Sequence, residues 1–187
     1  MSLPRTLDDA DALTGSPPAA RLLRAAWLGT VPYAEGLALQ EALVAARKRG
    51  EQEDTLLLLE HPPVITLGRG ADPSNLRRTP EDLSAMQVEL FRTGRGGDVT
   101  YHAPGQLVGY PILALPEPWR DLHKLLRGVE EVLIAVARDF GVEAGRIPNL
   151  TGVWVDNEKL AAIGMRVSRW VTSHGFALNV GTDLFGF

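Results

Sequence analysis

Arg95-Gly96-Gly97-Asp98-Val99-Thr100-Tyr101-His102-Ala103-Pro104-Gly105-Gln106 is the stretch around which the rest of this chain is best interpreted. Its glycines permit positive φ angles and a close approach of the backbone to a ligand, while Pro104 fixes one φ angle. Residues 88–92 alternate in polarity and lead into the stretch, and residues 106–113 lead out of it. We therefore expect a rigid loop between two strands of one sheet, with guanidinium, phenol and imidazole groups near a ligand.

The glycines do not form a known phosphate-binding pattern. The spacing fits neither the Walker pattern nor the dinucleotide pattern, and the stretch precedes a strand instead of opening a helix. Two interpretations remain open, a ligand-contacting loop and a tight hairpin. Arg95 and His102 favour the ligand-contacting loop.

Two helices are predicted on either side of this stretch. Over residues 33–49 the apolar positions have the i, i+3, i+4, i+7 spacing of one helical face, and Gly50 follows as a stop signal. Residues 122–140 carry a broad apolar stripe that ends before Gly141, so this helix is expected to lie across a sheet.

Short strands separated by Pro and Gly account for most of the remaining chain. Residues 55–59 and 64–67 are expected to be central strands, because both are apolar throughout. A tight turn at Asp156-Asn157 predicts a hairpin, and residues 170–180 predict one more strand. Runs of strands with two long helices indicate an α+β fold with mixed sheets packed against helices.

Length and composition narrow the class of protein. The 187 residues are 45% apolar, which suits a single domain over residues 21–187 preceded by a loosely held extension over residues 1–20. The net charge of −4 and the lack of a basic run argue against nucleic acid as a partner. No apolar run is long enough to span a membrane and no secretory signal is recognisable, so we expect a cytoplasmic protein. There are no cysteines and no paired histidines, which argues against disulfides and metal sites.

Three further segments each allow two interpretations. His61 precedes two prolines at the end of a strand, where a histidine is either a structural residue or a site residue. Residues 67–70 form either a turn or the basic rim of a pocket. Lys159 follows a turn and precedes a run of small apolar residues, so its amine is either solvated or carried into a pocket. His174 similarly begins an apolar stretch that suits either a pocket wall or a buried strand.

Four segments in this order closely resemble the octanoyltransferases, also called lipoyl(octanoyl) transferases or lipoate-protein ligase B. The resemblance extends from about Trp27 to the end of the chain. The segments are Leu59-Glu60-His61-Pro62-Pro63-Val64-Ile65-Thr66-Leu67-Gly68-Arg69, Arg95 to Gln106, Lys159-Leu160-Ala161-Ala162-Ile163-Gly164-Met165-Arg166, and Trp170-Val171-Thr172-Ser173-His174-Gly175-Phe176-Ala177-Leu178-Asn179-Val180.

The resemblance implies the catalytic fold of the biotin/lipoate protein ligases and an acyl transfer without ATP, metal or other cofactor. Octanoyl would pass from octanoyl acyl carrier protein to a cysteine thiolate, and then to a lysine of a lipoyl domain of the 2-oxoacid dehydrogenases or of the glycine-cleavage H protein. Lys159 matches the lysine that lowers the pKa of that cysteine. Residues matching the acyl site are Arg95, Gly96, Gly97, Asp98, Val99, Thr100, Tyr101, His102, Ala162, Ile163, Gly164, Gly175, Phe176 and Ala177. Backbone N–H groups near these glycines are candidates for stabilising an oxyanion.

The chain departs from the family pattern at two points. Ala103 replaces the first glycine of His-Gly-Pro-Gly-Gln, a change expected to have a small effect on the loop. The catalytic cysteine, which the family has in a Pro-Cys pair shortly after a segment like Leu178 to Leu184, is absent. We expect that the sequence is truncated at its C-terminus, and the rival interpretation is an inactive acyl-binding module that has no thiol.

An ATP-dependent lipoate or biotin ligase is the nearest alternative enzyme. The glycine- and arginine-rich segment of biotin ligases is missing, and Arg69-Gly70 alone does not replace it. Because acyl carrier proteins are acidic, the scattered residues Arg69, Arg77, Arg78 and Arg92 are candidate docking positions or simply solvated charges.

Overall fold

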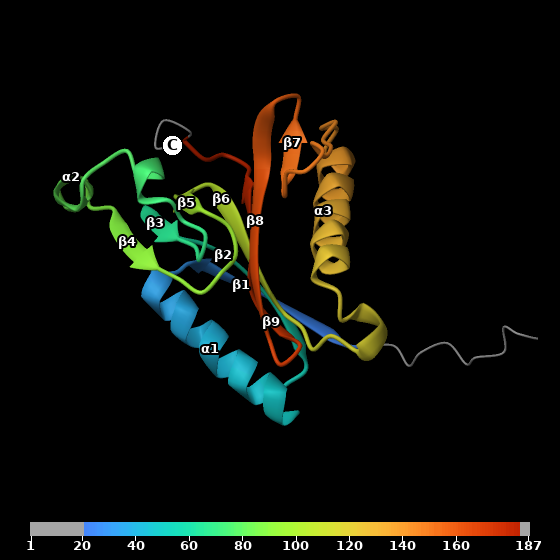
Figure 1. The fold of residues 1–187 in the computed structure, drawn as a ribbon. Coiled ribbons are helices and arrows are strands. Elements are labelled where there is room, and N and C mark those ends of the chain that lie inside the picture. Colours follow the sequence, from blue (N-terminus) through green and yellow to red (C-terminus); the bar gives the residue numbers. More distant parts are fainter. Residues whose placement is uncertain (1–20, 184–187) are drawn as a thin grey trace, which may run out of the picture.

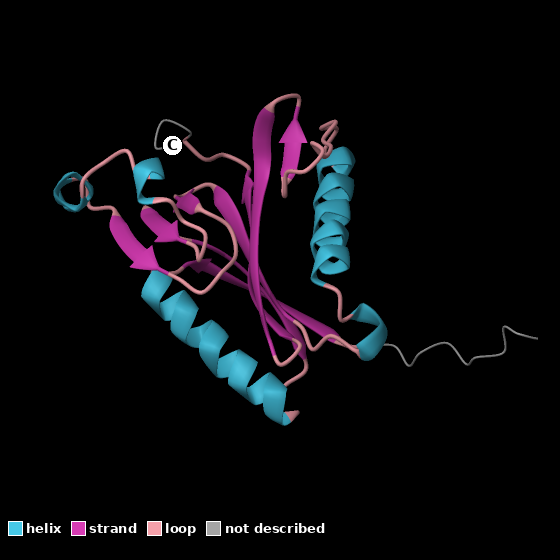
Figure 2. Cartoon of the chain, viewed as in Figure 1, coloured by secondary structure: helices cyan, strands magenta, loops and turns pink. Residues whose placement is uncertain are grey.

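A computed structural model describes residues 21–183 of the chain. The expected extension over residues 1–20 therefore lies outside the described residues. Two β-sheets and two long helices make up this range, as Figures 1 and 2 show. The predicted α+β class, with mixed sheets packed against helices, is confirmed.

The larger sheet has six strands in the order β1-β2-β6-β9-β8-β7. Its first pair, β1 with β2, is parallel and all its other pairs are antiparallel. The predicted hairpin at Asp156-Asn157 is its β7–β8 connection. In sheet order the strands are β1 (Leu23–Thr30), β2 (Asp54–Glu60), β6 (Gln106–Ile112), β9 (Val171–Asn179), β8 (Glu158–Ser168) and β7 (Val153–Val155).

The smaller sheet has three strands in the order β4-β3-β5. These are β4 (Glu89–Arg92), β3 (Val64–Leu67) and β5 (Val99–His102), with β3 parallel to β4 and antiparallel to β5. The two apolar segments expected to be central strands are both interior, β2 in the large sheet and β3 in the small one.

The glycine-containing stretch connects the two sheets, so the expectation that it lies between strands of one sheet is wrong. Residues Val99–His102 inside it form β5 and pair with β3. The chain then turns at Gly105, where φ is 82°, and enters β6 of the large sheet. Strand β5 is too short and too close to glycines to give a periodic signal of its own, and this explains the error.

Both long helices occur where the sequence predicted them. Helix α1 (Tyr33–Arg49) ends at Gly50, which has φ of 77° and donates its N–H to Arg47 O over 3.2 Å. Helix α3 (Leu122–Asp139) begins after Asp121, whose carboxylate accepts the Lys124 N–H over 3.1 Å. Three short elements were not predicted, namely helix α2 (Pro80–Ala85) and the 3₁₀ turns Pro73–Asn75 and Glu117–Trp119. No helix within residues 21–183 is long and apolar enough to cross a membrane.

The helices cover opposite faces of the large sheet (Figure 1). Because neighbouring residues of a strand point to opposite faces, Ala177 joins the core beneath α1 and Leu178 joins the core beneath α3. Leu43 of α1 packs on the first core and Leu133 of α3 belongs to the second. The small sheet has its own apolar cluster, which includes Leu83 of α2.

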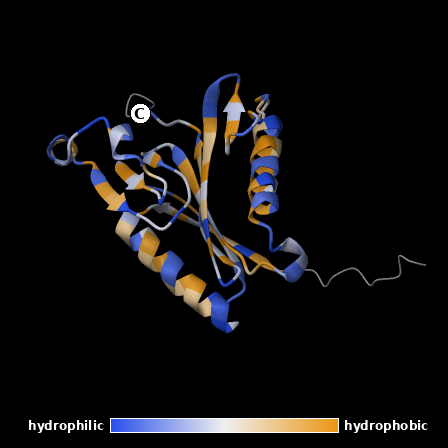
Figure 3. Ribbon diagram, in the orientation of Figure 1, coloured by the Kyte–Doolittle hydropathy of each residue, from blue (hydrophilic) through white to orange (hydrophobic). Residues whose placement is uncertain are grey.

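The apolar stripe of α3 is wider than the face that the helix buries. Leu133 and Ala137 are buried against the sheet, whereas Val132 is 62% exposed and Phe140 is 83% exposed. Polar and apolar bands alternate along the whole helix in Figure 3. Only part of the predicted stripe therefore lies across the sheet.

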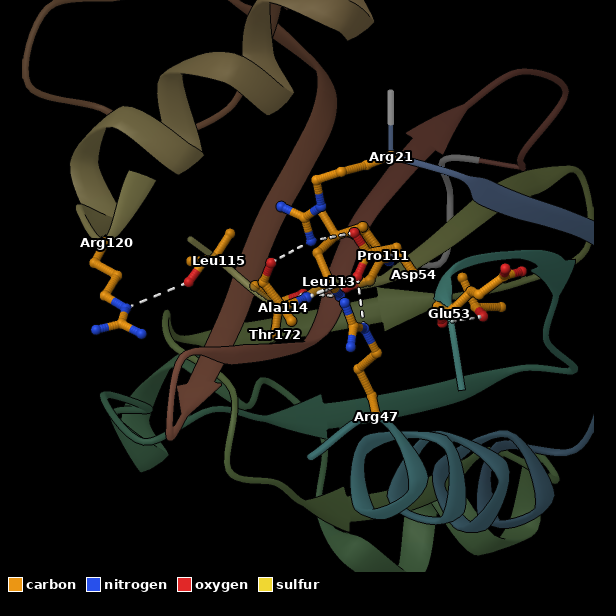
Figure 4. A network of polar contacts seen from close by, with 11 residues as sticks. Arg21, Arg47, Glu53, Asp54, Pro111, Leu113, Ala114, Leu115, Arg120 and Thr172 are labelled. Carbon is orange, nitrogen blue, oxygen red and sulfur yellow. Dashed lines mark hydrogen bonds and ion pairs between the residues drawn. The ribbon is translucent and has the colours of Figure 1, made fainter. Parts of the chain in front are cut away.

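A buried carboxylate ties the ends of several elements together (Figure 4). The carboxylate of Asp54, at the start of β2, accepts hydrogen bonds from Arg47 Nε over 2.8 Å and from the Ala114 N–H over 2.9 Å. The Arg21 guanidinium also donates a hydrogen bond to it. Asp54 thus joins the end of α1 to the segment that follows β6, and fixes the helix along the sheet.

Candidate active site

The stretch from Arg95 to Gln106, called the glycine loop below, is held to the segment after β3 and to β8 through backbone hydrogen bonds. Gly68 and Gly70 donate their N–H groups to Asp98 O and Gly97 O, each over 3.1 Å, and Gly96 donates to Met165 O of β8 over 2.9 Å. A Cβ atom on Gly68 would lie 2.3 Å from Gly97 O, so the close approach requires glycine. Because the Gly96 N–H is used in this way, it does not serve the oxyanion role considered for the N–H groups near the acyl-site glycines.

Arg95 braces the loop from inside. Its side chain is buried and donates to Thr66 O over 2.6 Å, to Gly96 O over 2.9 Å and to Asp98 O over 2.8 Å. No carboxylate among the described residues pairs with it, and burial lowers its pKa. Arg95 therefore shapes the loop and also places a buried positive charge beside the cavity described below.

Asp98 closes the same loop from its outer side. Its carboxylate accepts the Asp72 N–H over 3.0 Å and a hydrogen bond from the Asn75 amide. Gly97 has φ of 86° and Gly105 has φ of 82°, whereas Ala103 is outside the positive-φ region. The replacement of glycine by Ala103 therefore causes no backbone strain.

His102 has a defined tautomer. The Gln106 amide nitrogen donates to Asn179 Oδ1 over 2.9 Å, so the Gln106 carbonyl oxygen is the acceptor of His102 Nδ1–H at 2.7 Å. The Nε2 atom of His102 then carries a lone pair. Burial lowers the pKa of His102 to about 3, and the charge of Arg95 adds to this effect.

His61 is a structural histidine that orients a tyrosine. Its Nδ1 lies 2.6 Å from Val31 O, which only accepts, so Nδ1 carries the hydrogen and Nε2 accepts the Tyr110 hydroxyl at 2.7 Å. His61 is fully buried, and burial lowers its pKa. Of its two interpretations, the geometry favours the structural one.

A cavity of about 190 Å³ lies between the large sheet and the glycine loop. Most of the predicted site residues meet there. They are Lys159, Arg95, Gly97, Asp98, Val99, Thr100, His102, Ala162, Ile163, Gly164, Gly175, Phe176 and Ala177. Ile163 and Phe176 also pack against the core beneath α3, so they serve both regions.

Two predicted residues lie elsewhere. Gly96 does not line this cavity and instead binds the backbone of Met165. Tyr101 lines an adjoining groove of about 900 Å³, which shares Lys159 and Ala162 with the cavity and carries Arg77 and Arg78 on its wall.

Five lining residues were not predicted, namely Tyr33, Val108, Tyr110, Thr151 and His174. Tyr33 lies at the start of α1 and Tyr110 is separated from it by four strands in sequence, so only the fold brings them together. His174 was noticed as a polar residue at the end of an apolar stretch, but no pattern distinguished a pocket wall from a buried strand.

Lys159 lies at the exposed end of the cavity. Its Nζ is 5.3 Å from the centre of the Trp154 ring on the neighbouring strand β7, a cation–π contact that restrains the ammonium. The small residues Ala162, Gly164, Gly175 and Ala177 lie farther along β8 and β9. The arrangement suits a narrow ligand whose reactive end stays near Lys159. No group of three or more candidate metal ligands occurs among the described residues.

The fold and the cavity define an α+β catalytic domain of the lipoate ligase type. Two solved structures share this fold. One is a lipoate-protein ligase A bound with ATP, with a TM-score of 0.70, 18% identity and coverage of 87% of this chain and 68% of that one. The other is a bipartite lipoate protein ligase of Thermoplasma acidophilum, with a TM-score of 0.69, 19% identity and coverage of 88% and 64%.

Sequence comparison identifies the family. The model of the lipoyl protein ligase A/B catalytic domain matches residues 32–187, and the chain belongs to this family. An octanoyltransferase of Solibacter usitatus is 57% identical over 160 residues, which cover 86% of this chain and 73% of that protein. An octanoyltransferase of Rubrobacter xylanophilus is 54% identical over 161 residues, covering 85% and 72%.

Proposed function

We propose that this chain is the catalytic domain of an octanoyltransferase, which moves octanoyl from octanoyl acyl carrier protein to a lysine of a lipoyl domain in the cytoplasm. The observation that carries the proposal is the narrow cavity with small residues on its walls and the ammonium of Lys159 at its exposed end. The names of the relatives at 54% and 57% identity support the octanoyl group. The acceptors would be lipoyl domains of 2-oxoacid dehydrogenases and the glycine-cleavage H protein.

The proposed chemistry is a two-step transfer. A thiolate attacks the carbonyl carbon of the donor thioester and expels the carrier thiolate, which takes up a proton. The acceptor amine then attacks the new thioester, forms an amide, loses a proton and releases the enzyme thiol. The 187 residues contain no cysteine, so the first step, the attack by a thiolate, needs a thiol from outside them.

Lys159 is the residue proposed to favour the thiolate, because a fixed ammonium stabilises a neighbouring negative charge. The remaining proposed roles belong to the cavity walls. The residues proposed to line the acyl site are Arg95, Gly97, Asp98, Val99, Thr100, His102, Ala162, Ile163, Gly164, Gly175, Phe176 and Ala177, with Gly96 and Tyr101 supporting them from outside the cavity.

The test has a binding part and a transfer part. Calorimetric titration of this chain with octanoyl-N-acetylcysteamine should show saturable binding, whereas acetyl-N-acetylcysteamine, which lacks the alkyl chain, should bind much more weakly. The full-length protein should add the mass of an octanoyl group to an apo-lipoyl domain when octanoyl acyl carrier protein is the donor. Efficient lipoylation from free lipoate and ATP, with no transfer from the carrier, would instead identify an ATP-dependent ligase. Binding of the thioester without transfer by the full-length protein would support the rival interpretation, an inactive acyl-binding module.

A further inference from the structure

His174 has an unusual backbone conformation in the interior of strand β9. Its φ is 54°, in the left-handed region that residues other than glycine rarely enter because of steric strain. The pairing of β6 with β9 runs from Gln106↔Asn179 to Gly109↔Phe176, and its continuation would place Pro111 opposite His174. Because proline has no N–H, the pairing with β6 does not continue to this position, and His174 is paired only with Met165 of β8.

Side chains replace the missing pairing with β6 at Thr172 and at His174 itself. The Thr172 hydroxyl donates to Pro111 O over 2.5 Å and accepts the Leu113 N–H over 2.8 Å, as Figure 4 shows. The His174 N–H itself donates to Gln40 Oε1 of α1 over 2.7 Å. Gln40 is almost completely buried, so this bond fixes the left-handed conformation from the helix side.

The left-handed conformation decides where the imidazole lies. In a regular strand His174 would share a face with Phe176, which packs beneath α3. Instead its ring is 6.5 Å from the ring of Tyr110, which belongs to the core beneath α1. The imidazole is thereby placed in the wall of the cavity, and no hydrogen bond to it from residues 21–183 is present.

The cavity therefore has two different ends. Lys159 and Thr151 at its mouth are exposed. The inner end is formed by buried side chains with polar groups, which are Tyr33, Arg95, His102, Tyr110 and His174. Along β8 and β9, Lys159 is six residues from Met165, the pairing partner of His174, a span of roughly 20 Å. A ligand with its reactive end at the mouth would direct its alkyl end toward the polar inner end.

We propose that His174 is a specificity-determining residue that limits the length of the acyl chain. This inference rests on the proposed function, because it takes an acyl thioester as the ligand. Methylenes added beyond the limit must displace the imidazole and cover its nitrogens, which have no hydrogen-bond partner among residues 21–183. Burying polar groups without a partner opposes binding, so a longer chain is discriminated against by both shape and polarity.

His174→Gly is the decisive variant, because glycine adopts a φ of 54° freely and so keeps the backbone while it removes the ring. The probes are hexanoyl, octanoyl, decanoyl and dodecanoyl thioesters of N-acetylcysteamine, titrated calorimetrically into the chain. Arg169→Gly is the matched control, since Arg169 has φ of 50°, is exposed and does not line the cavity. His174→Asn tests polarity, because asparagine also tolerates this conformation but keeps a polar group.

The expected wild-type affinity rises about fourfold per methylene up to octanoyl and stops rising at decanoyl. In His174→Gly the ratio of decanoyl to octanoyl affinity should increase about tenfold, with little change in His174→Asn and none in Arg169→Gly. An unchanged ratio in His174→Gly, while octanoyl still binds, would overturn the inference and leave the proposed function intact. Equal shifts in the Gly and Asn variants would refute the role of polarity. If the wild-type chain binds none of the four thioesters, the proposed function itself fails.

Discussion

At the scale of single residues, the position of Lys159 depends on one aromatic neighbour. Trp154 is buried in β7, and its ring faces the Lys159 ammonium across the β7–β8 hairpin. A lysine side chain has several rotatable bonds, so a fixed ring restricts where its charge lies. The ammonium is thereby kept at the mouth of the cavity, where the proposed thiolate would need it.

Replacing Lys159 by alanine should slow acylation of the full-length protein and move its pH profile upward by about one unit or more. The physical reason is that an ammonium near a thiol lowers the pKa of the thiol by roughly one to three units. The rate of octanoyl adduct formation, followed by mass spectrometry from pH 6 to pH 9, measures this shift. Lys124→Ala on α3 is the control and should leave the profile unchanged. A normal profile in Lys159→Ala would remove Lys159 from the proposed role.

Gly175 illustrates a second effect at this scale, the close approach of two strands. A Cβ atom on Gly175 would lie 2.1 Å from Gly109 O and 2.5 Å from Pro111 Cδ, and both neighbours belong to the backbone or to a rigid ring. Gly175→Ala should therefore lower the free energy of unfolding by about 3 kcal/mol, as measured by urea denaturation. Gly145→Ala, which meets nothing within 4 Å, should change it by less than about 0.5 kcal/mol. A similar small change at Gly175 would show that the strands separate easily.

At the scale of elements, one carboxylate joins α3 to the strand that it covers. Glu130 is buried. Its carboxylate accepts hydrogen bonds from Arg127 Nη1 over 2.6 Å, from Arg146 Nε over 2.8 Å and from the Gly152 N–H over 3.1 Å. Burial alone would raise the pKa of Glu130, but these hydrogen bonds together lower it. The carboxylate thus connects the helix to the loop that leads into β7.

Glu130→Gln should destabilise the protein by about 2 kcal/mol at pH 7, because the amide cannot accept all three donors and leaves buried polar groups without partners. Glu131→Gln is the matched control one residue away. Its side chain is 71% exposed, so the loss of its ion pair with Arg146 should cost less than about 0.5 kcal/mol. Chemical denaturation of both variants measures the difference. Equal effects would argue that burial of Glu130 contributes nothing.

The elements differ in how well the sequence predicts them, for physical reasons. Helix α1, with Gly50 as its stop, and the hairpin at Asp156-Asn157 were both predicted from local signals. The apolar face predicted for α1 is not the face that it buries, because Leu39 is 37% exposed whereas Gly36 and Gln40 are buried. Strand β1 was missed because its burial does not alternate and Trp27 is 59% exposed. The stretch from Arg95 to Gln106 was recognised as a site loop, but the connection between two sheets depends on the long-range pairing of β5 with β3.

The inner end of the cavity was only partly predictable from single segments. His174 adopts its conformation because Pro111 comes opposite it in the register and Gln40 reaches it from α1. None of these three residues is near another in sequence. The walls that the family motifs supply were predicted, including Arg95 and His102 at the polar end, whereas Tyr33, Tyr110 and His174 were not.

At the scale of the whole molecule, five rings from different elements gather around one buried cation. Tyr33 of α1 is 5.1 Å from His61 and 6.3 Å from His102, and His61 is 5.9 Å from Tyr110, which contacts His174. Burial raises the pKa of Tyr33 to about 12 and lowers the pKa of His174 to about 4, with the charges of Arg95 and Arg166 lowering the latter further. Both phenols and all three histidines are thus held neutral at pH 7.

This neutral cluster predicts that stability falls as the pH drops below about 6.5, before the carboxylates titrate. His102 and His174 have folded-state pKa values of about 3 and about 4, below the value of about 6.5 in an unfolded chain. Between pH 6.5 and pH 5 the unfolded state therefore binds protons that the folded state does not, and each such proton lowers the free energy of unfolding by about 1.4 kcal/mol per pH unit. Their contribution is fully present above pH 6.5 and is lost toward pH 4 and pH 3.

Urea denaturation at a series of pH values measures the slope, which His174→Asn should reduce by about one proton and His123→Asn on the exposed side of α3 should not. A slope that His174→Asn leaves unchanged would mean that the imidazole is protonated in the folded protein.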